Sequence, residues 1–288
     1  MKLKFNHPLR LTAKEVSFTY PNGIEALRNI NLDIYEGDFI GLLGSNGSGK
    51  TTLLKCLDGI IKSFKGNINL DDKDIRSLSA REIYSKIGLV FQNPDDQLFA
   101  STVFEDVAFG PINMGFDASE VAKRVYRALE EIEMADMAER TINSLSFGQK
   151  KRVCIAGLLS MGQSILLLDE PTAGLDPVGE YKMMNLLTKL NREQRVTIVM
   201  ATHSVDLVPV FINKLFVLSD GAIIKEGTSE EIFTAPTHME EVKLRMPQIG
   251  ELLYELKHKD KLPIEKIPLT IGEARRQIMD MIMRKIDG

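Results

Sequence analysis

Apolar and polar positions alternate along residues 11–44, and turn-forming residues interrupt the alternation at positions 21–23 and 36–38. A period of two is typical of strands that bury one face, and Pro, Asn, Gly and Asp favour the tight turns between such strands. This part of the chain therefore predicts a lobe of short antiparallel strands.

The pattern changes at Phe39, where an apolar run leads into glycines and then into a segment with helical spacing. Further apolar runs alternate with amphipathic stretches at residues 87–91, 165–168, 196–201 and 215–218. Apolar runs of this length between helices indicate strands that are buried on both faces. We therefore expect an α/β core built on one mostly parallel sheet.

Helical periodicity dominates residues 102–161, and it predicts a mainly helical subdomain inserted into the core. After about Glu241 prolines divide the chain into short pieces, the last of which is an amphipathic helix over residues 272–285. Four apolar residues on one face of this helix favour a packing surface over a ligand site: Ile278, Met279, Ile282 and Met283. We therefore divide the chain into a domain over residues 1–240 and a C-terminal extension over residues 241–288.

Composition narrows the class of protein further. The chain has 288 residues, 44% of them hydrophobic and 26% charged, which is typical of a globular protein with a sizeable core. A formal net charge of -4 gives no overall attraction to a polyanion, so we expect no nucleic-acid partner. Cys56 and Cys154 lie in apolar stretches and are expected as buried thiols in a reducing compartment.

The amino-terminal residues lack the apolar core of a signal peptide, and no apolar stretch is long enough to span a membrane. We therefore expect a cytoplasmic protein. If it serves a membrane process, it must dock on separate membrane proteins.

Residues 44–51 read GSNGSGKT and follow a predicted buried strand, which is the context that a G-x-x-x-x-G-K-[ST] phosphate-binding loop requires. Its glycines let backbone N–H groups converge on phosphate oxygens, and the following helix adds the positive end of its dipole. Lys50 is expected on the β- and γ-phosphates and Thr51 on Mg²⁺. The alternative is an incidental glycine turn before a surface lysine. The expected ATP-binding residues here are Gly44, Ser45, Asn46, Gly47, Ser48, Gly49, Lys50, Thr51 and Thr52.

Asp169 and Glu170 end the apolar run that begins at Ile165. A carboxylate at Asp169 suits the coordination shell of Mg²⁺, and Glu170 suits a general base that positions water for hydrolysis. Strands that end in acidic residues are common by themselves, so these roles depend on the phosphate loop.

Residues 145–152, LSFGQKKR, resemble the LSGGQ signature of ABC transporter ATPases. The other motifs of that family follow in order, with Tyr20 as the aromatic that stacks on adenine, Gln92 in the Q-loop, residues 173–176 as the D-loop and His203 as the switch histidine. Outside this context, Tyr20 could be a strand-end aromatic and His203 a structural histidine. The resemblance implies an α/β P-loop NTPase of the ABC ATPase fold. Its parts are an antiparallel β subdomain, a RecA-like core, an inserted helical subdomain and a small C-terminal extension.

The resemblance also implies a head-to-tail pair in which each ATP lies between the phosphate loop of one subunit and the signature of the other. In that pair Ser146, Gly148 and Gln149 contact the nucleotide and Asp176 communicates across the interface. Glu170, His203 and Gln92 are then the catalytic residues, and Thr51, Gln92 and Asp169 hold Mg²⁺. Phe147 replaces the first glycine of the signature, so its side chain must point away from phosphate.

Residues 90–115, together with the signature and D-loop, resemble the ATPase subunits of energy-coupling-factor importers, most closely those for cobalt. This implies a pair formed with itself or with a paralogue, a transmembrane coupling protein, a substrate-binding membrane subunit and a peripheral location on the cytoplasmic face of the cell membrane. Asp95, Asp96 and Gln97 would lie near the docking groove, or in an ordinary polar loop. Cobalt or nickel is the first expected cargo, and vitamins are the alternative. Two rival classes are a soluble ABC ATPase that acts on nucleic acid and a P-loop kinase.

Overall fold

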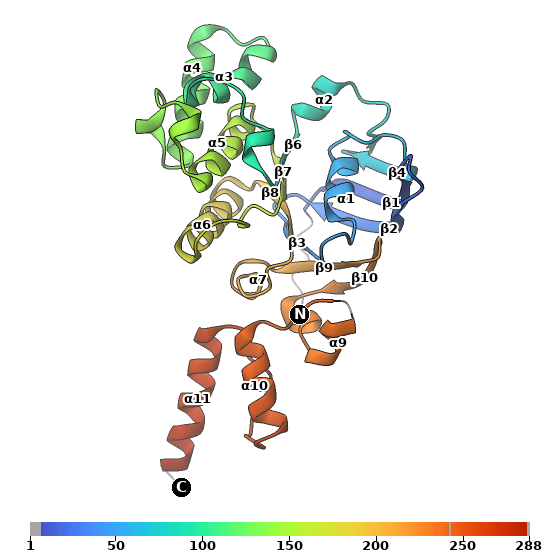
Figure 1. The fold of residues 1–288 in the computed structure, drawn as a ribbon, viewed down its shortest axis with the longest axis vertical. Helices are drawn as coiled ribbons and strands as arrows, with labels where there is room; N and C mark the ends of the chain where they lie inside the picture. The colour runs from blue at the N-terminus through green and yellow to red at the C-terminus, as the bar shows by residue number, and fades with distance from the viewer. Residues whose placement is uncertain (1–6, 242, 287–288) are drawn as a thin grey trace.

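An antiparallel sheet of four strands forms one side of the molecule, of which the computed structural model describes residues 7–241 and 243–286 (Figure 1). Its order is β2-β1-β4-β5, with β1 Leu9–Thr19, β2 Glu25–Tyr35, β4 Lys65–Leu70 and β5 Lys73–Asp74. The antiparallel lobe is confirmed, but β1 and β2 are long rather than short. The turn-forming residues at 21–23 and 36–38 lie between strands, as predicted. Within the pair of β1 and β2, several register shifts let the strands bend and twist without ending.

The second sheet has six strands in the order β10-β9-β3-β8-β7-β6. Its strands are β3 Phe39–Leu43, β6 Ile87–Val90, β7 Ile165–Asp169, β8 Thr197–Thr202, β9 Lys214–Ser219 and β10 Ala222–Gly227. Every neighbouring pair except the β9–β10 hairpin is parallel, which confirms the mostly parallel sheet. The apolar-run criterion missed β10 because this edge strand alternates half-buried and exposed residues.

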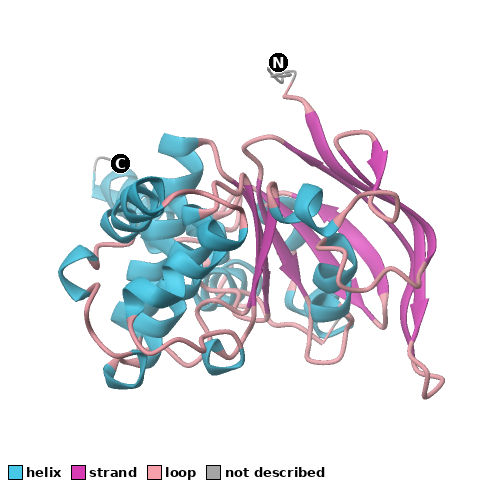
Figure 2. Ribbon diagram, turned by 90° about the horizontal axis from the view of Figure 1, so that it is seen from above, coloured by secondary structure: helices cyan, strands magenta, loops and turns pink. Residues whose placement is uncertain are grey.

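Helix α1, Lys50–Leu57, lies between the two sheets, whereas most helices cover the opposite face of the parallel sheet (Figure 2). Strand β7 shows how both faces are buried. Ile165 and Leu167 pack toward α1, and Leu166 and Leu168 pack toward the larger helical layer. Cys56 and Cys154 belong to these separate clusters and are buried free thiols, as predicted.

Helices α3 Val103–Asn113, α4 Ala118–Glu131 and α5 Phe147–Ser160 pack on one another within the segment for which a helical subdomain is predicted. Thr102 and Ser146 begin α3 and α5 with capping boxes, and the Asp117 carboxylate caps α4. Short helices complete the connections: α2 Ala80–Tyr84, α7 Val208–Phe211, α8 Ser229–Ile232, α9 Pro236–Glu241 and the 3₁₀ turns Pro94–Asp96, Ala135–Met137 and Ile142–Ser144. Helix α6, Pro177–Gln194, follows β7 and covers the sheet.

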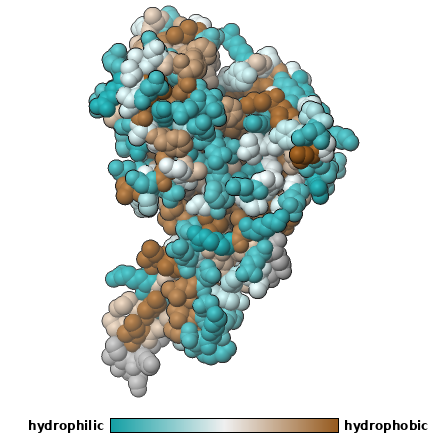
Figure 3. Space-filling view, in the orientation of Figure 1, coloured by the Kyte–Doolittle hydropathy of each residue, from teal (hydrophilic) through white to brown (hydrophobic). Residues whose placement is uncertain are grey.

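Helices α10 Gln248–His258 and α11 Ile271–Ile286 project from the rest of the molecule (Figure 1). They share only a small buried cluster around Leu253, Ile264 and Ala274. The four apolar residues predicted to share one face of α11 are between 36% and 55% exposed. Apolar side chains gather along this projection in Figure 3, so the predicted packing face has no partner within the described chain. Among the described residues, no helix is both long and apolar enough to cross a bilayer.

Candidate nucleotide-binding site

A cavity of about 680 Å³ lies beside the loop between β3 and α1. It gathers residues from the antiparallel sheet, the phosphate loop and the ends of β6 and β7. Ten of the predicted site residues line it: Tyr20, Asn46, Gly47, Gly49, Lys50, Thr51, Thr52, Gln92, Asp169 and Glu170. His203 joins this group through a hydrogen bond to Glu170. Gly44, Ser45 and Ser48 belong to the same loop but do not line the cavity.

The phosphate loop needs glycine at Gly49, the residue that precedes α1. Its φ of +106° lies in the left-handed region, and a Cβ there would come within 2.6 Å of the Ala26 carbonyl oxygen. Helix α1 therefore starts against the antiparallel sheet, with its first N–H groups directed at the cavity and no side chain capping them. This geometry can bind phosphate oxygens.

Lys50 carries a buried positive charge, since its side chain is 6% exposed. Its Nζ donates to the carbonyl oxygens of Gly44 at 2.7 Å and Ser45 at 3.1 Å, and the Glu170 Oε1 lies 3.7 Å away. Burial lowers the pKa of Lys50, and the nearby carboxylates of Glu170 and Asp169 oppose that shift. A phosphate anion at this position would stabilise the ammonium and replace the loop carbonyls as its partner.

Asp169 and Thr51 fit a magnesium ion. The Thr51 Oγ1 donates to the Asp169 Oδ2 at 2.7 Å, so both oxygens already point to one place. The other carboxylate oxygen of Asp169 is buried and has no hydrogen-bond partner. Burial raises the pKa of Asp169, although the Thr51 hydrogen bond opposes the shift. Asp169 and Thr51 would hold Mg²⁺ here, and the ion would supply positive charge beside the phosphate groups.

Glu170 and His203 form a pair at the ends of β7 and β8. The His203 Nδ1 lies 2.8 Å from the Glu170 Oε1, while the histidine side chain is 50% exposed and the glutamate 6%. Glu170 has a φ of +50°, a left-handed conformation that costs a residue with a Cβ about 1–2 kcal/mol. Strain of this kind gathers at functional sites, and here it turns the carboxylate toward the cavity. The arrangement suits a general base oriented by histidine.

The end of the cavity at Tyr20, where adenine is predicted to stack, contains residues that sequence reasoning missed. Tyr20 stands on the edge of Phe18 and its hydroxyl lies 3.0 Å from the Thr52 Oγ1. Opposite walls come from β2 and from the β9–β10 turn, whose Gly221 N–H donates to the Ser48 carbonyl. The missed lining residues are Asn22, Ile24, Glu25, Ala26, Arg28, Asp220 and Gly221. The Asp220-Gly221 dipeptide is a turn signal that could have indicated the β9–β10 hairpin, but nothing local indicates that this turn meets the phosphate loop, which is distant in sequence.

The signature residues Ser146, Gly148 and Gln149 do not line this cavity, and neither does Asp176. Ser146 instead begins α5, with its Oγ accepting from the Gln149 N–H at 3.3 Å. Asp176 similarly caps α6. The sequence therefore supplies two half-sites that the single chain keeps apart.

Phe147 packs against its own D-loop. A Cβ on Gly174 would lie 3.0 Å from the Phe147 Cε1, and one on Gly148 would lie 3.2 Å from the Leu175 Cδ2. Gly174 has a φ of +78°, so the contact uses the one residue type that fits both the conformation and the space.

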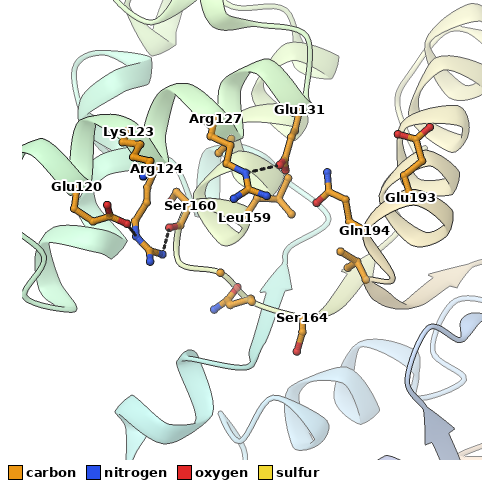
Figure 4. Close-up of a pocket in the computed structure, with 14 residues that line it drawn as sticks. Glu120, Lys123, Arg124, Arg127, Glu131, Leu159, Ser160, Ser164, Glu193 and Gln194 are labelled. Atoms are coloured by element: carbon orange, nitrogen blue, oxygen red, sulfur yellow. Dashed lines mark hydrogen bonds and ion pairs between the residues drawn. The ribbon is translucent and has the colours of Figure 1, made fainter. Parts of the chain in front are cut away.

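A second cleft, of about 530 Å³, opens between α4, the end of α5 and the end of α6 (Figure 4). Its arginines already have partners, since Arg124 pairs with Glu120 at 2.7 Å and Arg127 with Glu131 at 3.3 Å. No phosphate-loop residue lies here. Both arginine charges of this cleft are thus matched within α4.

Comparison with known proteins shows the family to which the chain is similar. Residues 27–173 match the ABC transporter family. Over 274 residues the chain is 60% identical to a protein of Geobacter sulfurreducens provisionally named an ABC transporter ATP-binding protein, covering 95% of this chain and 98% of that one. It is 46% identical, also over 274 residues, to the energy-coupling factor transporter ATP-binding protein EcfA of Methanocaldococcus jannaschii, covering 94% and 98%.

Two solved structures are also similar. One is CbiO1 of Clostridium perfringens, described as part of the ABC transporter complex CbiONQ, with a TM-score of 0.74, 41% identity and coverage of 85% of this chain and 99% of that one. The other is a dimeric ATP-binding cassette in a post-hydrolysis state with ADP and phosphate, with a TM-score of 0.68, 34% identity and coverage of 76% and 98%. These likenesses confirm the predicted fold.

Replacing Glu170 with Gln removes the proposed base but keeps its size. We expect steady-state ATP turnover to fall by about 10²–10⁴-fold, because that is the usual contribution of a positioned proton acceptor. Binding of a fluorescent ATP analogue should stay within a few-fold of the parent, since Lys50 and the rest of the phosphate loop are unchanged. Glu130→Gln, on the exposed side of α4, is the control. Turnover by Glu170→Gln at the parent rate would contradict the assignment.

Phe147→Gly tests the departure from the usual signature. We expect the parent to hydrolyse ATP and the variant to remain active. Its free energy of unfolding should be about 1 kcal/mol lower, because glycine weakens the first turn of α5 and the packing on Gly174 is lost. Urea denaturation and an ATPase assay measure the two effects, with Phe147→Leu as the control that retains an apolar side chain. An inactive parent would show that the motif with Phe147 does not function.

Proposed function

Because the chain belongs to the family of ABC transporter ATP-binding proteins, we propose that it hydrolyses ATP as one of two cassettes of an energy-coupling-factor importer. Hydrolysis coupled to transport is the activity of this family. One observation supports a paired site above all others. The phosphate loop, both carboxylates and Tyr20 meet at one cavity, while Ser146 and Gly148 lie outside it in the same chain.

In the proposed pair, the start of α5 from one subunit faces the phosphate loop of the other. The first N–H groups of α5 and the Ser146 hydroxyl would then bind the γ-phosphate, because a helix N-terminus attracts anions. His203 orients the Glu170 carboxylate toward the attacking water, and Gln92 approaches from the end of β6. The likeness to a dimeric cassette supports this arrangement.

We propose a docking groove for the transmembrane coupling protein between α2 and α3. A cavity of about 570 Å³ lies there, and its rim carries three aromatic side chains that are at least half exposed, Tyr84, Phe99 and Phe109. Phe99 and Phe109 meet edge to face with centroids 4.6 Å apart. Exposed aromatics around a hollow favour an inserted apolar helix. Asp95 pairs with Lys150 at 2.6 Å, which links this region to the signature helix.

The cargo that we propose is cobalt or nickel, with vitamins as the alternative. Support comes from the resemblance of residues 90–115 to cobalt-import subunits and from the likeness to CbiO1. The chain would sit on the cytoplasmic face of the cell membrane, attached through its groove to the membrane subunits. Identifying the proteins that copurify with it from native membranes would test the importer assignment. ATPase stimulation by DNA or RNA would favour the rival class of soluble ABC ATPases.

Phe109→Ser should detach the chain from the coupling protein. We expect recovery of the membrane subunits in detergent pull-downs to fall about tenfold or more, as it does when a buried interface aromatic is removed. ATP turnover by the isolated chain should not change. Ile112→Ser is the matched control, since Ile112 is an exposed residue of the same helix outside the groove. Equal recovery with both variants would contradict the proposed groove.

We further propose that residues 241–288 help to hold the two cassettes together. The exposed apolar face of α11 supports this, because a second copy would remove it from water. Replacing Ile282 and Met283 with Ser should raise the dissociation constant for self-association about tenfold, given two apolar side chains lost from each copy. Sedimentation velocity measures the change, with Arg275→Ser on an exposed position of the same helix as the control. Unchanged self-association would argue against this role.

A further inference from the structure

Lys151 is a buried lysine to which neither the sequence motifs nor the proposed mechanism gives a role. It lies in the first turns of α5 and is 1% exposed. Its Nζ donates to the carbonyl oxygen of Glu170 at 2.7 Å and to that of Ala173 at 2.8 Å. The ring centroid of Phe147 lies 5.1 Å from the same nitrogen. One ammonium therefore contacts the turn after β7 and the residue that departs from the usual signature.

The turn that Lys151 holds carries the candidate base. The Glu170 carbonyl also accepts from the Ala173 N–H at 3.1 Å, which closes a tight turn over residues 170–173. Glu170 is the residue with the left-handed backbone, and its carboxylate direction depends on that conformation. Gly174 follows directly, beneath the Phe147 ring. Lys151 and Phe147 thus fasten α5 to the start of the D-loop at two adjacent points.

We propose that Lys151 is a positioning residue that keeps the Glu170 turn and the D-loop attached to the signature helix, so that the base of one ATP site moves with the helix that closes the other. This rests on the proposed paired site. In that pair the N-terminus of α5 contacts the partner's nucleotide, whereas Glu170 serves the nucleotide of its own chain. The lysine links the two half-sites within one subunit, because it belongs to α5 and its Nζ donates to the backbone of Glu170 and of the D-loop.

The chemistry of the position favours a role beyond filling space. Two backbone carbonyls converge on the Nζ of a side chain that is 1% exposed, and an unsatisfied buried acceptor is destabilising, so a donor is required there. An ammonium offers several donors from one atom, which a neutral aliphatic side chain cannot do. Burial lowers the pKa of Lys151 to about 8, with the carboxylate of Glu170 opposing the shift, so the charged form still predominates at neutral pH.

A purely structural lysine would stabilise the fold without affecting turnover in the folded protein. A positioning lysine would instead affect kcat more than ATP binding, because Lys151 does not line the nucleotide cavity. The two roles therefore predict different kinetics.

The test uses Lys151→Met in the full chain, which keeps the length of the side chain and removes both donors. We expect kcat to fall at least about tenfold, while KM and the dissociation constant for a fluorescent ATP analogue stay within about threefold, because misplacing a catalytic group by a fraction of an ångström affects chemistry more than binding. Lys151→Gln keeps N–H donors on a shorter, neutral side chain and should recover part of kcat. Lys123→Met, an exposed lysine of α4, should match the parent.

Thermal melting shows which variants are folded. If Lys151→Met does not fold, the kinetic comparison is made with Lys151→Gln. A folded variant with kcat within about twofold of the parent would overturn the proposal, as would kcat and ATP affinity falling by the same factor. An inactive parent would instead count against the proposed ATPase function. The two failures are therefore distinguishable.

Discussion

The nucleotide site depends on buried charges that the protein by itself leaves incompletely matched. Lys50 is almost fully buried, and it holds the carbonyls of its own loop at short distances while the Glu170 carboxylate stays farther away. Asp169 keeps one buried oxygen without a partner. A phosphate group would match the positive charge of Lys50, and a divalent cation would bind the free oxygen of Asp169. Parallel strands make this possible, because their carboxyl ends bring β3, β7 and β8 to one edge.

The position of α5 explains why the signature residues do not reach the phosphate loop within one chain. Helix α5 begins with a capping box on Ser146, and its N-terminus packs on the D-loop rather than on the phosphate loop of the same chain. Because the predicted signature residues lie apart from the phosphate loop of the same chain, we expect a second copy or a paralogue to bring them together. The contacts of Lys151 and Phe147 then connect α5, which would face the nucleotide of the partner subunit, to Glu170, which would act on the nucleotide of its own chain.

Several local features were predictable because their signals are short-range. The phosphate loop, the apolar strands and the capping residue Ser146 each follow from a few neighbouring residues. Strand β10 and the cavity wall at Asp220 and Gly221 were not predictable in this way, since a half-exposed edge strand lacks an apolar run and the phosphate loop that this wall meets is distant in sequence. The long strands β1 and β2 were underestimated because bulges let strands continue through residues that usually end them.

By itself, the sequence determined that this protein binds phosphate on a glycine-rich loop, that two carboxylates end a buried strand, and that an ABC signature lies between them. Those conclusions depend on residue types at fixed spacing, which local physics constrains. Only the tertiary structure decided that Lys151 holds the Glu170 carbonyl, that Phe147 rests on Gly174, and that the apolar face of α11 stays exposed. The reason is that a buried ammonium and an unpartnered helix face look like ordinary helical residues until long-range packing fixes what surrounds them.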